Sequence, residues 1–185
     1  ITSVVIREVA KKKEDAKVWL RTLMGVKDFT MPATVILALL VPLFLPGASG
    51  DIGTLVRIAV VVMLADTLSL SFYGVLRGLG SLKYESLGIF VGQSITTLIG
   101  LLLILTGTAT LQLLIIALIA GSVWNMLFSA FVLARQLGVR AFIPNWTLGW
   151  KPLKVAFAFF LAAAFVKVYS YVDSFVLLHV MGEEA

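Results

Sequence analysis

Cysteine is absent from the 185-residue chain, and histidine occurs only once, as His179. The sequence therefore excludes disulfides and thiolate metal sites, and one histidine cannot form a histidine-based zinc site or a Ser/His/Asp triad within the chain. Charged residues are also scarce, at 14% of the chain, whereas a typical soluble domain carries about 25%. These shortages argue against a soluble enzyme.

Apolar residues are abundant instead and make up 60% of the chain. They gather in stretches close to the roughly 20 residues that a helix needs to cross about 30 Å of hydrocarbon. The stretches are continuous rather than alternating, and an open sheet cannot satisfy its edges in lipid, so strands are not expected. The sequence predicts an all-α polytopic membrane protein, a transmembrane helix bundle with about five spans at approximately 29–46, 54–76, 87–106, 111–134 and 153–181.

The basic residues of the loops all lie on one side of these spans. Residues 1–28, 76–86 and 134–154 contain thirteen Lys and Arg residues, and the loops on the opposite side contain none. This asymmetry predicts that the basic segments are cytoplasmic and that the protein is a multi-pass protein of the cell (inner or plasma) membrane. The net charge of +5 then requires no nucleic acid partner. The positions that we expect to contact lipid headgroups are Lys11, Lys12, Lys13 and Arg77.

Four charged residues fall within the predicted spans, where a charge at the helix centre costs about 2.5–3.5 kcal/mol or more on insertion scales. Asp66 and Lys167 are central in their spans. Asp173 follows Lys167 by six residues, which places these two on different faces of one helix. Arg57 lies about one turn inside the outer end, from where a long side chain can reach the interface.

Two interpretations of these charges stay open. In the first, they line a water-filled path for an ionic substrate or a coupling ion, and the path residues are Asp66, Lys167, Asp173, Tyr171 and Arg57. In the second, Asp66 and Lys167 form an interhelical ion pair that holds the bundle together, and Tyr171 packs between helices rather than contacting sugar rings. The sequence shows no catalytic motif and no metal-binding motif.

Glycine and proline predict local features of the spans. The pairs Gly74/Gly78 and Gly88/Gly92 have the G-x-x-x-G spacing that permits close approach of two helices. Pro32, Pro42 and Pro46 fall in or beside the first predicted span, and they predict that this span is bent.

Three stretches resemble a known family. REVAKKKEDAKVWL is similar to the basic cytoplasmic loop after the second helix of the polysaccharide and lipid-linked oligosaccharide flippases. YGVLRGLGSLKYESLG resembles their loop between helices four and five, and residues 151–185 resemble the start of their second lobe. These flippases are the O-antigen transporter type of the multidrug/oligosaccharidyl-lipid/polysaccharide exporter superfamily.

The resemblance implies that the chain is a fragment of a transporter with 12–14 helices in two lobes. Residues 1–28 would be a cytoplasmic basic segment, 29–134 would hold helices of the first lobe, 135–152 would be the cytoplasmic loop between lobes, and 153–181 would be the first helix of the second lobe. Asp173 would match the aspartate of helix seven. Arg77 would match the basic cytoplasmic position after helix four.

The function that the resemblance implies is a non-enzymatic flippase. It would export a polyprenyl-diphosphate-linked oligosaccharide for cell-surface polysaccharide biosynthesis by alternating access, without a cofactor, as a transporter that is monomeric when full length. H⁺ or Na⁺ is the candidate coupling ion. One alternative is a drug/cation antiporter of the same superfamily, with Asp66 or Asp173 as the ion carrier. A membrane-embedded glycan polymerase or ligase is disfavoured, because the outer loops are too short to hold a catalytic domain.

Overall fold

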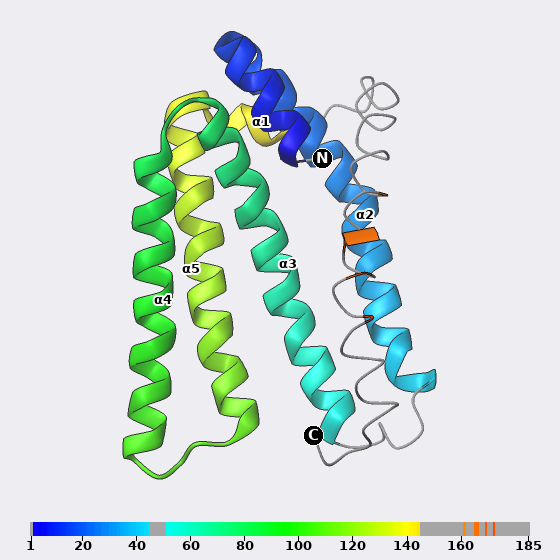
Figure 1. The fold of residues 1–185 in the computed structure, drawn as a ribbon, viewed down its shortest axis with the longest axis vertical. Coiled ribbons are helices and arrows are strands. Elements are labelled where there is room, and N and C mark those ends of the chain that lie inside the picture. The colour runs from blue at the N-terminus through cyan, green and yellow to red at the C-terminus, as the bar shows by residue number, and fades with distance from the viewer. Residues whose placement is uncertain are drawn as a thin grey trace. The chain divides into compact units, whose positions relative to one another are not determined.

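A computed structural model describes the backbone of residues 2–44 and 51–144, the side chains of residues 2–40 and 53–144, and a few separate positions after residue 160. The chain divides into one unit at Thr2–Thr147 and a second that holds Leu148–Ala185. All of the regular structure that is described in the first unit is helical (Figure 1). Its elements are α1 (Thr2–Lys11), η1 (Lys13–Asp15), α2 (Ala16–Phe44), α3 (Asp51–Gly78), α4 (Leu82–Leu105), α5 (Leu111–Leu137) and η2 (Val139–Phe142).

Among the described residues, four helices are long and apolar enough to cross a membrane. The candidate spans are Lys13–Leu40, Gly53–Gly78, Leu82–Leu105 and Leu111–Leu137. The structure thus confirms an all-α, multi-pass membrane protein for the part of the chain that it describes. The last three of these spans lie within a few residues of the predicted 54–76, 87–106 and 111–134. The predicted span at 153–181 lies outside the described residues.

The first span begins earlier than the predicted residue 29, because α2 is already helical at Ala16. Ala16, Leu20 and Leu23 recur at helical spacing and are buried, whereas Lys17 on the other side of the helix is exposed. Lys17 and Arg21 lower the hydropathy of this amphipathic part of the helix, and the predicted first span therefore starts only at residue 29. Part of the predicted cytoplasmic segment 1–28 is therefore the first half of α2.

The glycine pairs do bring helices together. Gly74 and Gly78 face α1, and a methyl group at Gly78 would lie 2.7 Å from Cβ of Val9. Gly92 on α4 and Gly121 on α5 face each other, and a methyl group at Gly121 would lie 2.7 Å from the carbonyl oxygen of Gly92. Small residues at such crossings allow the dispersion contacts that hold helices together in lipid.

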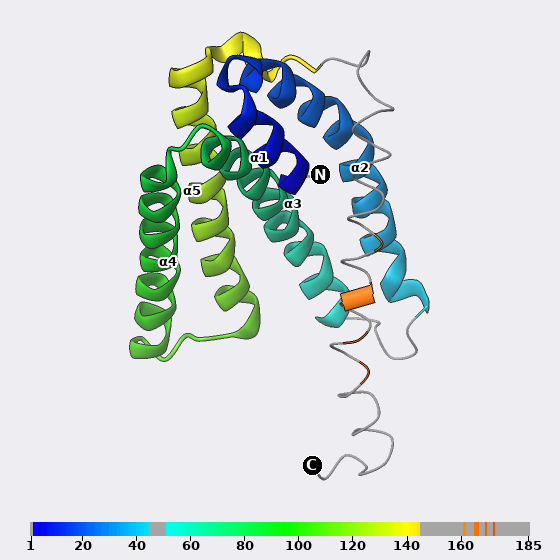
Figure 2. The ribbon, with the colours of Figure 1, turned by 45° about the horizontal axis from the view of Figure 1, so that its top comes forward.

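The basic segments of the first unit lie at one end of the bundle. The turn between α3 and α4, η1 and η2 are at the same end in two views (Figure 1, Figure 2). Arg21 of α2 donates two hydrogen bonds, of 3.0 and 3.3 Å, to the carbonyl oxygen of Arg140 in η2. The chain reverses between α3 and α4 through Gly80, whose φ of +80° favours glycine. Most of the described cations that the sequence assigns to one side of the membrane are thus at one end of the fold, Lys27 being midway along the candidate span Lys13–Leu40. Lys151 and Lys154 lie outside the described residues.

The contact between α4 and α5 predicts a matched pair of glycine substitutions. Gly121→Ala should destabilise the protein by about 1–3 kcal/mol, because the new methyl group meets the α4 backbone and the Thr96 hydroxyl. Gly100→Ala is the control, since the nearest atom to its new methyl group is 4.0 Å away on Leu114. Thermal unfolding in detergent measures both variants. Equal melting temperatures for the two would contradict the close crossing.

The orientation is testable because the chain contains no cysteine. Single cysteines at Ser81, in the basic α3–α4 turn, and at Thr108, in the uncharged α4–α5 loop, probe opposite ends of the bundle. A membrane-impermeant maleimide added to intact cells should label Thr108→Cys and spare Ser81→Cys until the cells are opened. The reverse pattern would place the basic end outside.

Candidate functional site

Asp66 is a charged residue at the middle of the candidate span Gly53–Gly78. It lies on α3, twelve residues before Gly78 and therefore about 18 Å from that end of the helix along its axis. Its side chain is exposed, and it makes no ion pair with any residue that the structure describes. Its backbone carbonyl accepts a 3.0 Å hydrogen bond from the Ser69 hydroxyl. A short carboxylate at this depth cannot reach the membrane surface.

Arg57 does not neutralise Asp66. The two residues are nine positions apart on α3, which places them on opposite faces of the helix and about 13 Å apart along its axis. The Arg57 side chain is exposed, within two turns of the start of α3 at Asp51. This position keeps open the interpretation that it reaches the interface.

The other three predicted path residues, Lys167, Asp173 and Tyr171, lie outside the described residues. The suggested pair of Asp66 with Lys167 therefore stays a prediction.

Arg77, one of the predicted headgroup contacts, has a partner that the sequence did not indicate. Its guanidinium makes a two-pronged ion pair with Glu85 across the α3–α4 turn, and its Nε lies 2.6 Å from Oε2 of Glu85. The Glu85 residue is buried, at 7% exposure, whereas the Arg77 side chain keeps 38%. Two parallel hydrogen bonds of this kind fix geometry as well as charge. Arg77 thus ties α3 to α4 while its outer edge stays accessible.

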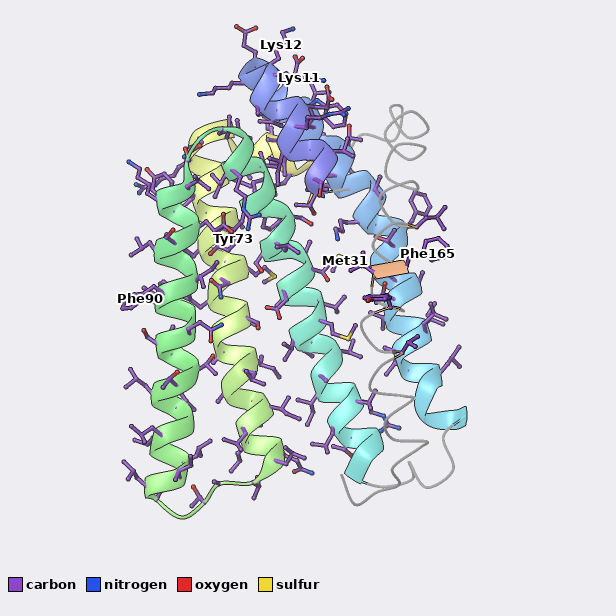
Figure 3. The ribbon with its side chains drawn as sticks, viewed as in Figure 1. Lys11, Lys12, Met31, Tyr73, Phe90 and Phe165 are labelled. Carbon is purple, nitrogen blue, oxygen red and sulfur yellow. The ribbon has the colours of Figure 1, made fainter. Side chains whose placement is uncertain are left out.

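A second polar contact, one turn deeper, joins α3 to α5. Tyr73 of α3 lies against Gly88 of α4, and its hydroxyl donates a 3.1 Å hydrogen bond to Oδ1 of Asn125 on α5. The Tyr73 side chain lies between the helices (Figure 3), where the residue is only 3% exposed. The Asn125 amide in turn lies against Gly92, where a side chain would collide with it. One tyrosine and one asparagine therefore connect three helices.

The three predicted headgroup lysines lie at the exposed basic end, where Lys11 and Lys12 are labelled in Figure 3. Lys11 lies 3.0 Å from the Glu8 carboxylate and Lys12 lies 3.5 Å from Asp15. Hydrogen bonds from Lys11 and then from Arg7 hold the pKa of the Glu8 carboxyl below its ordinary value. Lys13 makes no ion pair with a described residue. These pairs are exposed, so water screens them and the lysines stay available to anionic headgroups.

Sequence reasoning missed Tyr73, Glu85 and Asn125. The signal for Glu85 was its place eight residues after Arg77, across a short turn that contains Gly80. No comparable signal existed for Tyr73 and Asn125, which are 52 residues apart. Within the described residues, no three His, Cys, Asp or Glu side chains group as metal ligands do.

Comparison with known proteins assigns no family, since no family model, no curated protein and no solved structure matches the chain.

The Arg77–Glu85 pair predicts an asymmetric mutational result. Arg77→Ala leaves the buried Glu85 carboxylate without its counter-ion, and should cost on the order of 2 kcal/mol, less than the 3–5 kcal/mol of a fully buried pair. The double variant Arg77→Ala/Glu85→Ala should recover part of that loss. Lys17→Ala, which removes an exposed cation that pairs with no described carboxylate, should change little. Thermal unfolding in detergent would contradict the pair if the double variant were the least stable.

Proposed function

We propose that this chain acts in the export of a polyprenyl-diphosphate-linked oligosaccharide across the cell membrane, by alternating access. The observation that carries the transport part of the proposal is the exposed carboxylate of Asp66 in the middle of a candidate span. The substrate class rests on the resemblance of residues 7–20, 73–88 and 151–185 to the lipid-linked oligosaccharide flippases.

The argument from Asp66 is energetic. A charged aspartate facing lipid at the helix centre costs about 2.5–3.5 kcal/mol on insertion scales, and intramembrane charges accordingly face water-filled cavities or partners. No described residue pairs with Asp66. A hydrated path along this face of α3 removes the cost and gives the carboxylate a role in moving a polar solute.

The basic end supports the choice of an anionic lipid-linked substrate. Exposed lysines on η1 and on the first turn of α2, Lys13 and Lys17, pair with no described carboxylate. Cations beside a membrane surface attract anionic headgroups by about 1 kcal/mol each. A diphosphate-linked lipid in the same leaflet would gather there before its polar head enters the path.

A drug/cation antiporter is the second candidate, and Asp66 also favours it. A single membrane-embedded carboxylate can take up H⁺ or Na⁺ and release it on the other side. In that case Asp66→Asn would abolish drug resistance and leave surface glycan intact.

The test is a chromosomal Asp66→Asn substitution in the source organism, with surface polysaccharide and membrane abundance measured together. We expect loss of most export at an unchanged protein level, because the amide keeps the shape and loses the charge. Glu14→Gln is the control, since it also converts a carboxylate to an amide but at an exposed position of η1, at the basic end of the bundle.

Lys167→Ala and the double variant separate transport from structure. If Asp66 and Lys167 are a structural ion pair, each single change lowers the protein level and the double change restores both abundance and export. That restoration would overturn the proposal. Loss of export in all three variants at normal abundance would support it.

A further inference from the structure

Proline distinguishes α2 from the other three candidate spans. α3, α4 and α5 contain none, whereas Pro32 lies in the interior of α2. Proline has no amide hydrogen, so the carbonyl of Asp28 loses its helical donor, and the ring crowds that carbonyl. Two residues later the Thr34 hydroxyl donates a 2.8 Å hydrogen bond to the carbonyl of Thr30, a contact that also bends helices. α2 nevertheless stays one helix from Ala16 to Phe44 and curves along its length (Figure 2).

Burial also changes along α2, about two turns before Pro32. In the half at the basic end, Ala16 and Leu20 are fully buried and Leu23 is 1% exposed. None of residues 26–40 is buried, and Ile36 and Leu37 are 58% and 65% exposed. The basic half is therefore tightly packed, whereas the other half is only partly covered along one face, where Lys27, Met31, Val35 and Ala38 are of intermediate exposure.

Hydrogen bonds anchor the packed half further. The two bonds from Arg21 to the carbonyl of Arg140 tie the start of α2 to η2, which directly follows α5. Arg21 cannot make them if the first turns of α2 rotate or slide. Any movement of α2 must therefore occur after Arg21, in the part of the helix that these two hydrogen bonds do not hold.

The apolar character of the other half makes such movement inexpensive. Residues 33–40 read ATVILALL and carry no charge. Lipid tails solvate these side chains equally well in any orientation, so swinging them exposes no polar group to hydrocarbon. The cost of bending is confined to the backbone near Pro32, where one helical hydrogen bond is already absent.

We propose that α2 bends at a hinge around Pro32, with the half from Ala16 to Asp28 fixed to α3 and η2 and the half beyond Pro32 moving in the membrane. The hinge proposal does not depend on which solute is transported. A negative result for the hinge would therefore leave the proposed transport function standing. The hinge is also independent of Asp66, which lies on proline-free α3.

Spin labels on the cysteine-free chain in nanodiscs test the hinge. The mobile half is reported by Leu37→Cys with Val61→Cys on α3, and the anchored half by Lys17→Cys with Lys83→Cys on α4. A third pair, Val61→Cys with Leu118→Cys on α5, reports whether α3 itself moves. All of these positions are exposed. We expect a broad or multi-peaked distance distribution for the first pair and narrow distributions for the other two.

Pro32→Ala restores the missing hydrogen bond and should narrow the first distribution to the width of the other two. Pro42→Ala, in the last turn of α2, is the matched control and should leave the first distribution broad. A first distribution as narrow as the reference pairs in the unmodified chain would overturn the hinge, even if Pro32→Ala failed to insert. Equal narrowing by both proline variants, or no narrowing by Pro32→Ala, would overturn it as well.

Discussion

Hydrocarbon offers no hydrogen bonds, so every backbone amide and carbonyl of a membrane span must find its partner within the protein. The described spans meet this constraint as long helices, and the chain reverses at Gly80 and Gly107, just outside the helix ends. With their backbone groups used inside each helix, the helices hold together by other means. Close backbone approach at Gly92 and Gly121 supplies dispersion contacts, and the Tyr73–Asn125 hydrogen bond joins α3 to α5.

Two features of the described spans carry a cost in hydrocarbon. Pro32 removes a backbone hydrogen bond within the membrane span Lys13–Leu40, and Asp66 sets a carboxylate where lipid would penalise it. Packing does not offset either cost, because the Asp66 side chain is exposed and none of residues 26–40 around Pro32 is buried. A role in movement or in conduction explains why a sequence would keep them.

Run length and composition were enough to predict the helical class and, within a few residues, the helices α3, α4 and α5. Glycine spacing also predicted close contacts at Gly74/Gly78 and Gly88/Gly92. The first span was predicted to start at residue 29, later than α2 does, because Lys17 and Arg21 lower the local hydropathy, although Leu20 and Leu23 beside them are buried. A hydropathy average cannot distinguish a polar loop from an amphipathic helix that packs on one face.

Pairings between helices depend on register, which a single sequence does not contain. From the sequence, Arg77 is predicted to be a free cation at a membrane surface. Only the geometry of the α3–α4 turn shows that Glu85 lies opposite Arg77 and pairs with it. Asp66 differs from Arg77, because its depth in the membrane can be predicted from its position in the span, whereas any partner of its side chain depends on the fold. Depth alone therefore made Asp66 a candidate from the sequence, and exposure on α3 without a described counter-ion strengthens that candidacy. A carboxylate on a proline-free helix stays at a fixed depth in the membrane, so it can serve transport only if movement elsewhere changes its access to water. Among the described helices, α2 with its proposed hinge at Pro32 is the one that can supply this movement.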